Sequence, residues 1–430
     1  MAPPAPDRPL VAIVGAGFAG LAAARELGRA DALVLVIDRA NHHTFQPLLY
    51  QVATAGLSPA DIAAPVRRIL ARQRNTGVLM GEVVEIGEDS VRVRTHSGDE
   101  RTIRFDHMIV AAGKEHDYFG HEHAWSKHAP GLKTIDDALD IRRRVLSAFE
   151  LAESTDDPAE RAAAMTFVIV GAGPTGVEMA GALAEIATRV IRQDFRRINT
   201  ANARIILVEG GPRVLAGYRE ASSASALRQI RSLGVDVRLE TMVTGIDGRG
   251  VSVVSGDDEE RIEARTVIWA AGVRAASIAA QLSDDRTRDG RVSVRADLTV
   301  PGRPNVFVVG DMAHVESEGA EVPGVAPAAT QMGRHAGRTV AGILAGKSDA
   351  RADFVYRDKG ALATIGRHRA VADLGGRSFG GFFAWLLWAG VHVFFLIGFR
   401  NKLLVMIQWV WSYVTFGRGA RLITERPAGD

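Results

Sequence analysis

The residues Gly15-Ala16-Gly17-Phe18-Ala19-Gly20 form a glycine-rich pattern, which returns 156 residues later as Gly171-Ala172-Gly173-Pro174-Thr175-Gly176. Each stretch follows a β-branched run and precedes an Ala/Leu-rich segment that is typical of a helix. In such a turn the first glycine permits the bend, the second lets the backbone approach a pyrophosphate, and the third lets the helix pack on the strand. One copy would also suit an ordinary strand-to-helix connection, but two copies in register predict two dinucleotide sites.

An acid ends the strand that follows each turn. The first is Asp38, 18 residues past Gly20, close to the ~20 expected of an acid that binds the ribose hydroxyls. The second is Glu209, which follows a helix that we expect to run to about Arg197. A carboxylate there would repel a 2′-phosphate, so the sequence favours NADH over NADPH. Two adenine dinucleotides in one chain indicate a flavin, FAD, and a nicotinamide, NADH, that exchange a hydride.

The two halves of the chain repeat one order of elements: glycine turn, meander, and an apolar strand that ends in Ala-Ala-Gly. Meander strands are expected at 78–85, 90–95 and 101–106, and again at 234–240, 251–255 and 261–268. A later apolar strand leads to Gly310-Asp311, where the aspartate can hydrogen-bond the flavin's ribityl chain or instead cap the next helix. We therefore expect an α/β fold with two Rossmann-like dinucleotide-binding domains, one inserted in the other, plus a C-terminal helical membrane-associated segment.

This reading divides the chain into four parts. They are a leader at 1–9, an FAD-binding domain at 10–135 and 292–350, an NADH-binding domain at 136–291, and a membrane-anchoring domain at 351–430. The residues expected to bind FAD are Gly15, Gly17, Gly20, Asp38, Arg39, Gln46, Ala112, Gly113, Gly310 and Asp311. Those expected to bind NADH are Gly171, Gly173, Gly176, Glu209, Ala271 and Gly272.

The amino-acid composition excludes several kinds of redox and metal site. The chain has 430 residues and no cysteine, which excludes disulfides, iron–sulfur clusters, thiolate zinc sites and a redox-active cysteine pair. A net charge of +2 gives no indication of a nucleic-acid partner. The histidines between His116 and His128 lack a metal-ligand pattern and are read as a surface loop, so no metal is expected. Residues 1–10 lack the apolar core of a signal peptide, and we expect the chain to begin in the cytosol.

The C-terminal tail does not suit a soluble enzyme. Residues 379–399 carry no Asp, Glu, Lys or Arg, a basic patch at 400–402 interrupts, and 403–416 is again apolar; four of the six tryptophans lie in this region. The first run is long enough to span a bilayer. Its glycines and the shorter second run instead favour a hairpin that dips into one leaflet, with Trp and Phe at the interface. A buried core helix or a dimer interface is the alternative.

On these residues the chain resembles the type II NADH dehydrogenases, single-subunit flavoproteins that reduce membrane quinone without pumping protons. Besides the two turns, the resemblance rests on the runs 43–53, 310–311, 358–366 and 398–402. One motif departs from the family pattern. Ala326-Pro327-Ala328-Ala329-Thr330-Gln331 has Pro327 where bacterial members often carry a glutamine, and it keeps Gln331.

The resemblance implies roles for three side chains. Glu178 would gate or relay a proton near the nicotinamide or quinone, although an acid there also suits the helix dipole. Gln331 is a candidate for quinone contact, and Lys402 would lie near a quinone carbonyl or, alternatively, snorkel to lipid headgroups. The implied partners are ubiquinone or menaquinone and a lipid bilayer surface, with a homodimer left open.

The resemblance also implies a location and leaves two other activities to be weighed. We expect a peripheral, monotopic protein on the cytoplasmic face of the cell membrane. A soluble NADH:acceptor reductase and a redox-sensing protein that binds flavin and NAD would use the same glycine turns, but neither would need the apolar tail.

Overall fold

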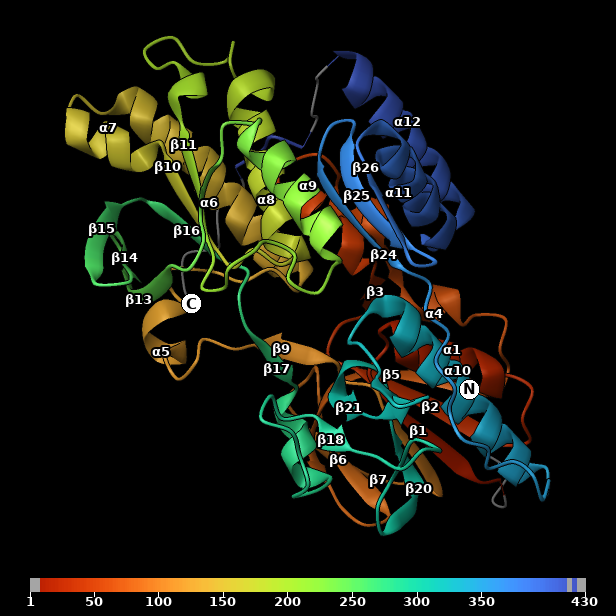
Figure 1. Cartoon of the computed structure of the whole chain (residues 1–430). Helices are drawn as coiled ribbons and strands as arrows, with labels where there is room; N and C mark the ends of the chain where they lie inside the picture. The colour runs from red at the N-terminus through yellow and green to blue at the C-terminus, as the bar shows by residue number, and fades with distance from the viewer. Residues whose placement is uncertain (1–7, 416–419, 424–430) are drawn as a thin grey trace. The chain divides into compact units, whose positions relative to one another are not determined.

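The computed structural model describes residues 8–415 and 420–423, and the chain forms two compact units (Figure 1). The first contains residues up to 43, 64–115 and 273–359, and the second contains 44–63, 116–272 and the residues from 360 onward. These limits differ from the predicted domain boundaries, which concern coenzyme binding and stay a prediction. Most of the predicted leader and the end of the apolar tail lie outside the described residues.

An eight-stranded sheet organises the first unit. Its central strand is β1 (Leu10–Val14), whose apolar residues are almost fully buried, with parallel neighbours on both sides. The strand order is β19-β20-β8-β1-β2-β5-β6-β7. The other strands are β2 (Leu33–Asp38), β5 (Thr76–Ile86), β6 (Ser90–Thr95), β7 (Glu100–Arg104), β8 (His107–Val110), β19 (Thr299–Val300) and β20 (Arg303–Val308). The first predicted meander, β5 to β7, is confirmed as an antiparallel extension of the sheet.

Two helices of the first unit pack very closely. Helices α1 (Phe18–Leu27) and α10 (Ala326–Leu344) are in contact at two glycines of α10. A Cβ at Gly333 would lie 2.1 Å from the carbonyl oxygen of Ala19, and one at Gly337 would lie 2.8 Å from that of Ala23. Glycine at both positions therefore allows backbone to pack on backbone.

The remaining elements of the first unit are short. They are α4 (Val66–Ile69), β17 (Val273–Ala275), β18 (Val292–Ser293), β21 (Ala313–His314), β22 (Glu316–Ser317), β23 (Ala320–Glu321) and the 3₁₀ turns Ser277–Gln281 and Gly310–Met312. Where the chain passes from one unit to the other it forms β3 (His42–Thr44), β4 (Ala63–Pro65) and β9 (Lys114–His116).

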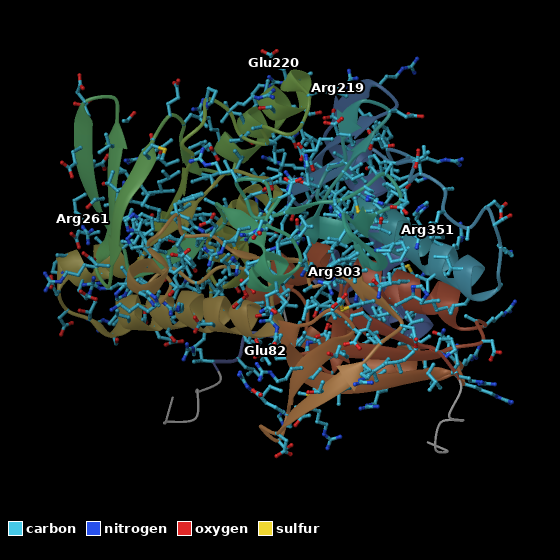
Figure 2. The ribbon with its side chains drawn as sticks, turned by 90° about the horizontal axis from the view of Figure 1, so that it is seen from below. Glu82, Arg219, Glu220, Arg261, Arg303 and Arg351 are labelled. Atoms are coloured by element: carbon cyan, nitrogen blue, oxygen red, sulfur yellow. The ribbon has the colours of Figure 1, made fainter. Side chains whose placement is uncertain are left out.

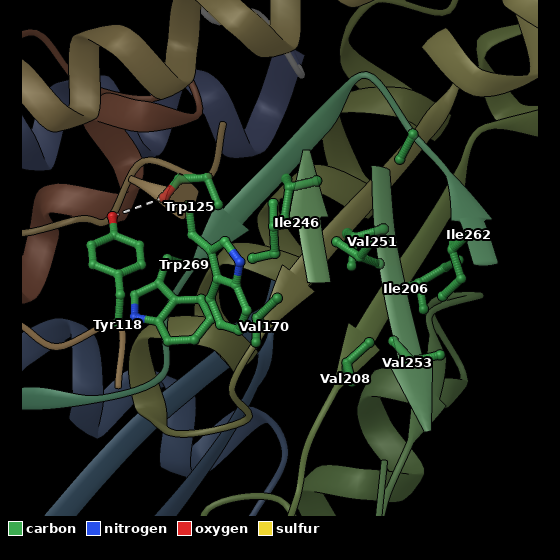
Figure 3. Close-up of a cluster of buried hydrophobic side chains, with 14 residues drawn as sticks. Tyr118, Trp125, Val170, Ile206, Val208, Ile246, Val251, Val253, Ile262 and Trp269 are labelled. Atoms are coloured by element: carbon green, nitrogen blue, oxygen red, sulfur yellow. Dashed lines mark hydrogen bonds between the residues drawn. The ribbon is translucent and has the colours of Figure 1, made fainter. Parts of the chain in front are cut away.

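A four-stranded parallel sheet, β12-β11-β10-β16, forms the centre of the second unit. Its strands are β10 (Thr166–Val170), β11 (Arg204–Val208), β12 (Asp236–Arg238) and β16 (Thr266–Trp269). Figure 3 shows its side chains packed against those of a separate antiparallel sheet, β13 (Met242–Asp247), β14 (Gly250–Ser255) and β15 (Asp258–Glu263). Tyr118 and Trp125 complete this core, where the Tyr118 ring stacks 5.0 Å from that of Trp269.

Three predictions for the second half are wrong in detail. Residues 234–240 do not start the meander, because β12 pairs in parallel with β11 and the meander begins only at Met242. The predicted strand 261–268 divides into β15 and β16, which belong to different sheets. The predicted helix to Arg197 is also too long, since α8 (Pro174–Glu185) ends in a π-helical turn at Ile186–Val190.

The helices of the second unit include α6 (Ile135–Ser154), which begins at a Thr134 capping box. The others are α2 (Leu49–Ala53), α3 (Pro59–Ile62), α5 (Glu122–Trp125), α7 (Pro158–Ala164) and α9 (Glu220–Arg231), with 3₁₀ turns at Gln46–Leu48 and Thr200–Asn202. The C-terminal part forms the sheet β24 (Ala361–Gly366), β25 (Arg369–Leu374) and β26 (Arg377–Gly380), followed by α11 (Phe382–Phe395) and α12 (Phe399–Thr415). Within the described residues, neither tail helix nor any other is both long and apolar enough to span a bilayer.

Charged side chains form ion pairs on the outside of each unit. In the first unit Glu82 pairs with Arg94 at 3.5 Å and Arg351 with Asp297 at 3.1 Å. Arg261 extends from the β14–β15 hairpin of the second unit, and Figure 2 labels Glu82, Arg351 and Arg261. Because exposed pairs contribute only about 0–1 kcal/mol each, we attribute the stability of both units mainly to their apolar cores.

Candidate functional site

The first glycine turn joins β1 to α1 and has the shape of a phosphate cradle. Gly15 has φ +100°, and a Cβ on it would lie 2.3 Å from the carbonyl oxygen of Ala111. A Cβ on Gly20 would lie 1.8 Å from the carbonyl oxygen of Gly15, so helix and strand can meet only through glycine. At Gly17, the residue before the helix, no described atom lies within 4 Å of where a Cβ would be. The backbone there is open to a ligand, and the helix N-terminus favours a negative charge.

The second turn, between β10 and α8, repeats this geometry. Gly171 has φ +97°, and a Cβ on it would lie 2.6 Å from the backbone nitrogen of Ala271. A Cβ on Gly176 would again lie 1.8 Å from the carbonyl oxygen of the first glycine, and the position of Gly173 is again open among the described atoms. Both turns therefore fit the pyrophosphate of a dinucleotide.

The two predicted acids complete the turns in the same way. The backbone N–H of Ala16 donates to Asp38 Oδ2 at 2.6 Å, and that of Ala172 donates to Glu209 Oε2 at 2.6 Å. The second oxygen of each carboxylate also accepts a backbone N–H, from Ala40 for Asp38 and from Gly211 for Glu209. Each carboxylate is thus fixed beside its turn, where a ribose would follow the pyrophosphate.

The small residues predicted beside the turns lie next to them. Ala112 and Gly113 follow β8, the parallel neighbour of β1, and Gly113 has φ +74° with open space around it among the described atoms. Gly310 has φ +72° and packs on Ala19 of α1, and Asp311 is half-buried. In the second unit Ala271 contacts the turn at Gly171.

Three other predicted residues have different surroundings. Gly272 has φ +62°, and a Cβ on it would lie 2.4 Å from the carbonyl oxygen of Asp117, so close packing of the chain requires this glycine. Arg39 is exposed and lies 4.0 Å from Glu82. Gln46 belongs to the second unit, where its amide donates to the carbonyl of Lys133 at 3.5 Å. The structure leaves the predicted FAD role of these two polar side chains untested.

A cavity of about 60 Å³ lies beside α8 in the second unit. Its lining includes Tyr50, Gln51 and Thr54 from α2 and the residue after it, Glu178, Ala182 and Glu185 from α8, Thr364 and Gly366 from β24, Arg367, and Trp409 and Ser412 from α12. The strand can lie against α8 because Gly181 has no side chain, since a Cβ there would lie 1.8 Å from the carbonyl oxygen of Ile365. Four chain segments that are distant in sequence thus form one site.

Glu178 gives this cavity an unusually weak carboxylic acid. Its side chain is half-buried because it lines the cavity, yet protein encloses the carboxyl and burial raises its pKa to about 8. The backbone N–H of Thr364, 3.5 Å from Oε1, opposes the shift only weakly. Burial, aided by the charges of Glu178 and Asp373, also raises the pKa of Tyr218. Glu178 is therefore a carboxylic acid that still carries its proton near neutral pH.

Aromatic and amide groups fix the wall opposite α8. The Trp409 indole N–H donates to Gln51 Oε1 at 2.8 Å, and Gln51 Nε2 donates to the Tyr50 hydroxyl oxygen at 2.8 Å. Trp409 also stacks on Trp388, with ring centroids 5.4 Å apart, and Trp388 in turn lies against His392. Burial lowers the pKa of His392 to about 4, so this ring is neutral near neutral pH.

The structure gives Gln331 and Lys402 other partners than the cavity. Gln331 forms two hydrogen bonds with the backbone of Arg357, each 3.0 Å long. Lys402 Nζ donates to the carbonyl of Phe394 at 2.5 Å, which satisfies an acceptor in the last turn of α11. Pro327 lies in the first turn of α10, where its missing N–H costs nothing. The predicted catalytic roles of Gln331 and Lys402 remain untested.

Sequence reasoning found Glu178 but assigned no role in the site to most of the cavity wall. Tyr50, Gln51 and Thr364 lie in runs that carry the family resemblance, which was the available signal. Trp409 was taken only as part of the apolar tail. Among the described residues, no group of three or more His, Asp or Glu side chains could hold a metal ion.

Comparison with known proteins agrees with this geometry. Residues 9–333 match the family described as pyridine nucleotide-disulphide oxidoreductase, and residues 359–419 match the NDH2 C-terminal domain. The chain is 44% identical to type II NADH:quinone oxidoreductase Ndh of Mycobacterium tuberculosis, over 98% of this chain and 92% of the relative. It is 27% identical to the type II NADH:quinone oxidoreductase of Staphylococcus haemolyticus, over 88% of this chain and 92% of the relative.

Two solved structures share the fold. The structure of NDH2 from Plasmodium falciparum in complex with NADH has a TM-score of 0.86 at 19% identity, covering 97% of this chain and 100% of that one. The sulfide:quinone oxidoreductase of Aquifex aeolicus has a TM-score of 0.70 at 18% identity, covering 92% of each chain. At these identities the likeness concerns the fold alone.

Proposed function

The chain belongs to the family of type II NADH:quinone oxidoreductases, and from this premise we propose how its residues serve the reaction. The chain is an FAD-dependent enzyme that oxidises NADH and reduces quinone without pumping protons. When bound, FAD supplies the redox chemistry, because it takes a hydride from NADH and passes two electrons on. The observation that carries our assignment is the pair of turns in which an alanine N–H donates to an acid at 2.6 Å.

In this proposal the first turn holds FAD and the second holds NADH. Backbone N–H groups at the start of α1 and α8 bind the pyrophosphates. Asp38 and Glu209 accept hydrogen bonds from the ribose hydroxyls. Gly113 and Asp311 lie beside the first turn and bind the rest of the flavin. The fixed carboxylate of Glu209 excludes the 2′-phosphate of NADPH by charge repulsion.

The cavity beside α8 serves the quinone side of the reaction. A quinone takes up two protons as it is reduced, and Glu178, whose pKa is raised to about 8, holds a proton at neutral pH. We assign Glu178 as the group that gives this proton to a quinone oxygen. Gln331 and Lys402 remain candidates for quinone contact, although each would first have to release its present partner.

The acceptor is a membrane quinone, ubiquinone or menaquinone, and we propose that the tail brings the enzyme to it. Helices α11 and α12 expose the large apolar side chains of Phe382, Phe383, Leu386, Phe394, Phe395, Leu403, Met406, Ile407, Val410 and Trp411. Exposed apolar groups of this kind, with Arg400 and Lys402 beside them, suit the interface of a bilayer. We place this contact on the cytoplasmic face of the membrane, and the proposal admits a homodimer.

The test uses the full chain purified in detergent. We expect a yellow protein with the absorbance of FAD, which consumes NADH when a short-chain quinone is added and does so much more slowly with NADPH. The decrease in NADH absorbance gives the rate. A colourless protein that does not take up FAD, or a flavoprotein without quinone-dependent turnover, would contradict the proposal.

A further inference from the structure

A buried histidine, His43, lies beside the first glycine turn. Only 3% of the residue is exposed, and its Nδ1 lies 3.0 Å from the carbonyl oxygen of Ala16. Because a carbonyl oxygen can only accept a hydrogen bond, Nδ1 carries the ring proton and is the donor. Burial lowers the pKa of His43, so the ring is neutral near neutral pH. Its Nε2 is enclosed by protein and has no hydrogen-bond partner among the described residues.

Two further contacts fix the ring of His43. The ring of Phe18, the first residue of α1, meets it edge to face, with centroids 5.0 Å apart and planes at 89°. The backbone N–H of Val66 donates to the carbonyl of Asn41 at 2.9 Å, which anchors the chain two residues before His43. These contacts hold the imidazole with Nδ1 facing the turn.

The backbone of Ala16 is thereby fixed on both sides. Its N–H donates to Asp38 and its carbonyl accepts from His43, so the peptide planes before and after Ala16 each have a partner. The Ala16–Gly17 peptide is trans, and in a trans peptide the carbonyl and the next N–H point in opposite directions. The Gly17 N–H therefore points away from the buried imidazole. Gly17 is exposed at the open part of the turn, so His43 orients the backbone that would meet a phosphate.

The second glycine turn holds the equivalent carbonyl with the main chain. There the carbonyl of Ala172 accepts the backbone N–H of Leu215 at 2.8 Å, while the N–H of Ala172 donates to Glu209. Each turn supplies a donor because a buried carbonyl without one costs free energy. The first turn takes its donor from a side chain, so a single substitution can remove it there and not in the second turn.

We propose that His43 is a positioning residue for FAD, whose Nδ1–H holds the Ala16–Gly17 peptide in the conformation that binds the pyrophosphate. The inference rests on the proposed function, in which the first turn holds FAD. His43 itself does not touch the coenzyme, since Nδ1 is bonded to the turn and Nε2 is enclosed by protein. Without the donor this peptide can rotate, and FAD has to order it on binding, which lowers the affinity.

The experiment measures how tightly the full-length holoenzyme keeps its FAD. The protein is diluted in detergent, free FAD is separated by filtration, and its fluorescence gives the dissociation constant. His43→Phe keeps an aromatic ring against Phe18 but has no donor, and we expect it to bind FAD about 10-fold more weakly, the effect of one net hydrogen bond. His43→Asn places an amide N–H near the position of Nδ1 and should restore most of the affinity. His43→Gln places its amide near Nε2 instead, and we expect the same loss as for His43→Phe.

A matched control is available in α10 of the same unit. The ring of His335 also donates to a backbone carbonyl, that of Ala352, and also packs edge to face on a phenylalanine, Phe354. His335→Phe therefore removes similar contacts elsewhere, and we expect it to keep the FAD affinity of the unaltered enzyme. Circular dichroism shows whether each variant folds, and the comparison of His43→Asn with His43→Gln decides the question if His43→Phe does not.

The outcomes separate this inference from the proposed function. Equal losses of FAD affinity for the His43 and His335 variants, equal losses for His43→Asn and His43→Gln, or no loss for any of them would overturn the role of His43. A His43→Phe protein that keeps its FAD but has a raised KM for NADH would overturn the assignment of the two coenzymes as well. Loss of FAD that only His43→Asn reverses, in an enzyme without quinone turnover, would contradict the proposed function and still support His43.

Discussion

The two glycine-turn units of this chain, β1–α1–β2 and β10–α8–β11, match in their turns and differ along their helices. In both turns a Cβ on the third glycine would lie 1.8 Å from the carbonyl oxygen of the first glycine. In both, the backbone N–H of the alanine after the first glycine donates to a carboxylate. Two residues past the third glycine, however, the first helix has the buried Ala22 and the second has Glu178.

This difference follows from what covers each helix. Helix α1 packs on α10 across Gly333 and Gly337, where there is room only for backbone and small side chains. Helix α8 packs on β24 across a single glycine, Gly181, and leaves a cavity beside it. The repeat therefore conserves the geometry that binds a dinucleotide, while the packing around the helix decides whether an acid can also act there.

The largest expected effect tests whether the two turns are separate sites. Gly20→Ala and Gly176→Ala each place a Cβ 1.8 Å from a carbonyl oxygen, which the turn cannot accommodate. We expect Gly20→Ala to lose flavin absorbance, and Gly176→Ala to keep it but lose detectable NADH oxidation. Circular dichroism shows whether each variant folds. Loss of flavin from the Gly176 variant alone would mean that the assignment of the two coenzymes is reversed.

The next effect concerns the position at which the two helices differ. If Glu178 gives a proton to quinone, Glu178→Gln should lower quinone turnover by roughly 10²-fold, within the range of general acid catalysis. Turnover of the unaltered enzyme should fall as pH rises through about 8, where Glu178 loses its proton, and the variant should lack this step. Ferricyanide takes electrons without protons, so its reduction serves as the control. An equal loss with both acceptors would contradict the role.

The same carboxyl should affect stability, with a definite sign. The pKa of Glu178 is 4.5 before folding and about 8 in the fold, so between these values the folded state binds more protons than the unfolded one. The free energy of unfolding then falls as pH rises through this window. We expect Glu178→Gln to be more stable than the unaltered chain at pH 8 by about 1–3 kcal/mol, less than the full shift implies because the cavity admits water. Urea denaturation at pH 5 and pH 8 measures this, and the two proteins should converge at pH 5.

The same contrast explains what the sequence could predict. The cradles were predictable because a glycine turn and its acid are local features whose geometry requires particular residues at fixed spacing. The cavity was not, because Tyr50, Glu178, Thr364 and Trp409 meet only through tertiary packing. The strand at 236–238 was misassigned for a related reason, since the apolar pattern does not specify whether a strand pairs with β11 or with the meander.

The smallest expected effect tests whether the hydrogen bond from Trp409 to Gln51 orients the cavity wall for quinone binding. The indole of Trp409 can only donate a hydrogen bond, so it fixes Gln51 with its oxygen toward α12 and its amide N–H toward Tyr50. Trp409→Phe removes this donor but keeps an aromatic ring against Trp388. We expect KM for quinone to rise about 3- to 10-fold with little change in kcat, because a net hydrogen bond is worth about 0.5–1.5 kcal/mol. Trp385→Phe, on α11 and outside the cavity lining, is the matched control. If both variants changed KM equally, the effect would belong to the tail helices in general and not to the orientation of Gln51.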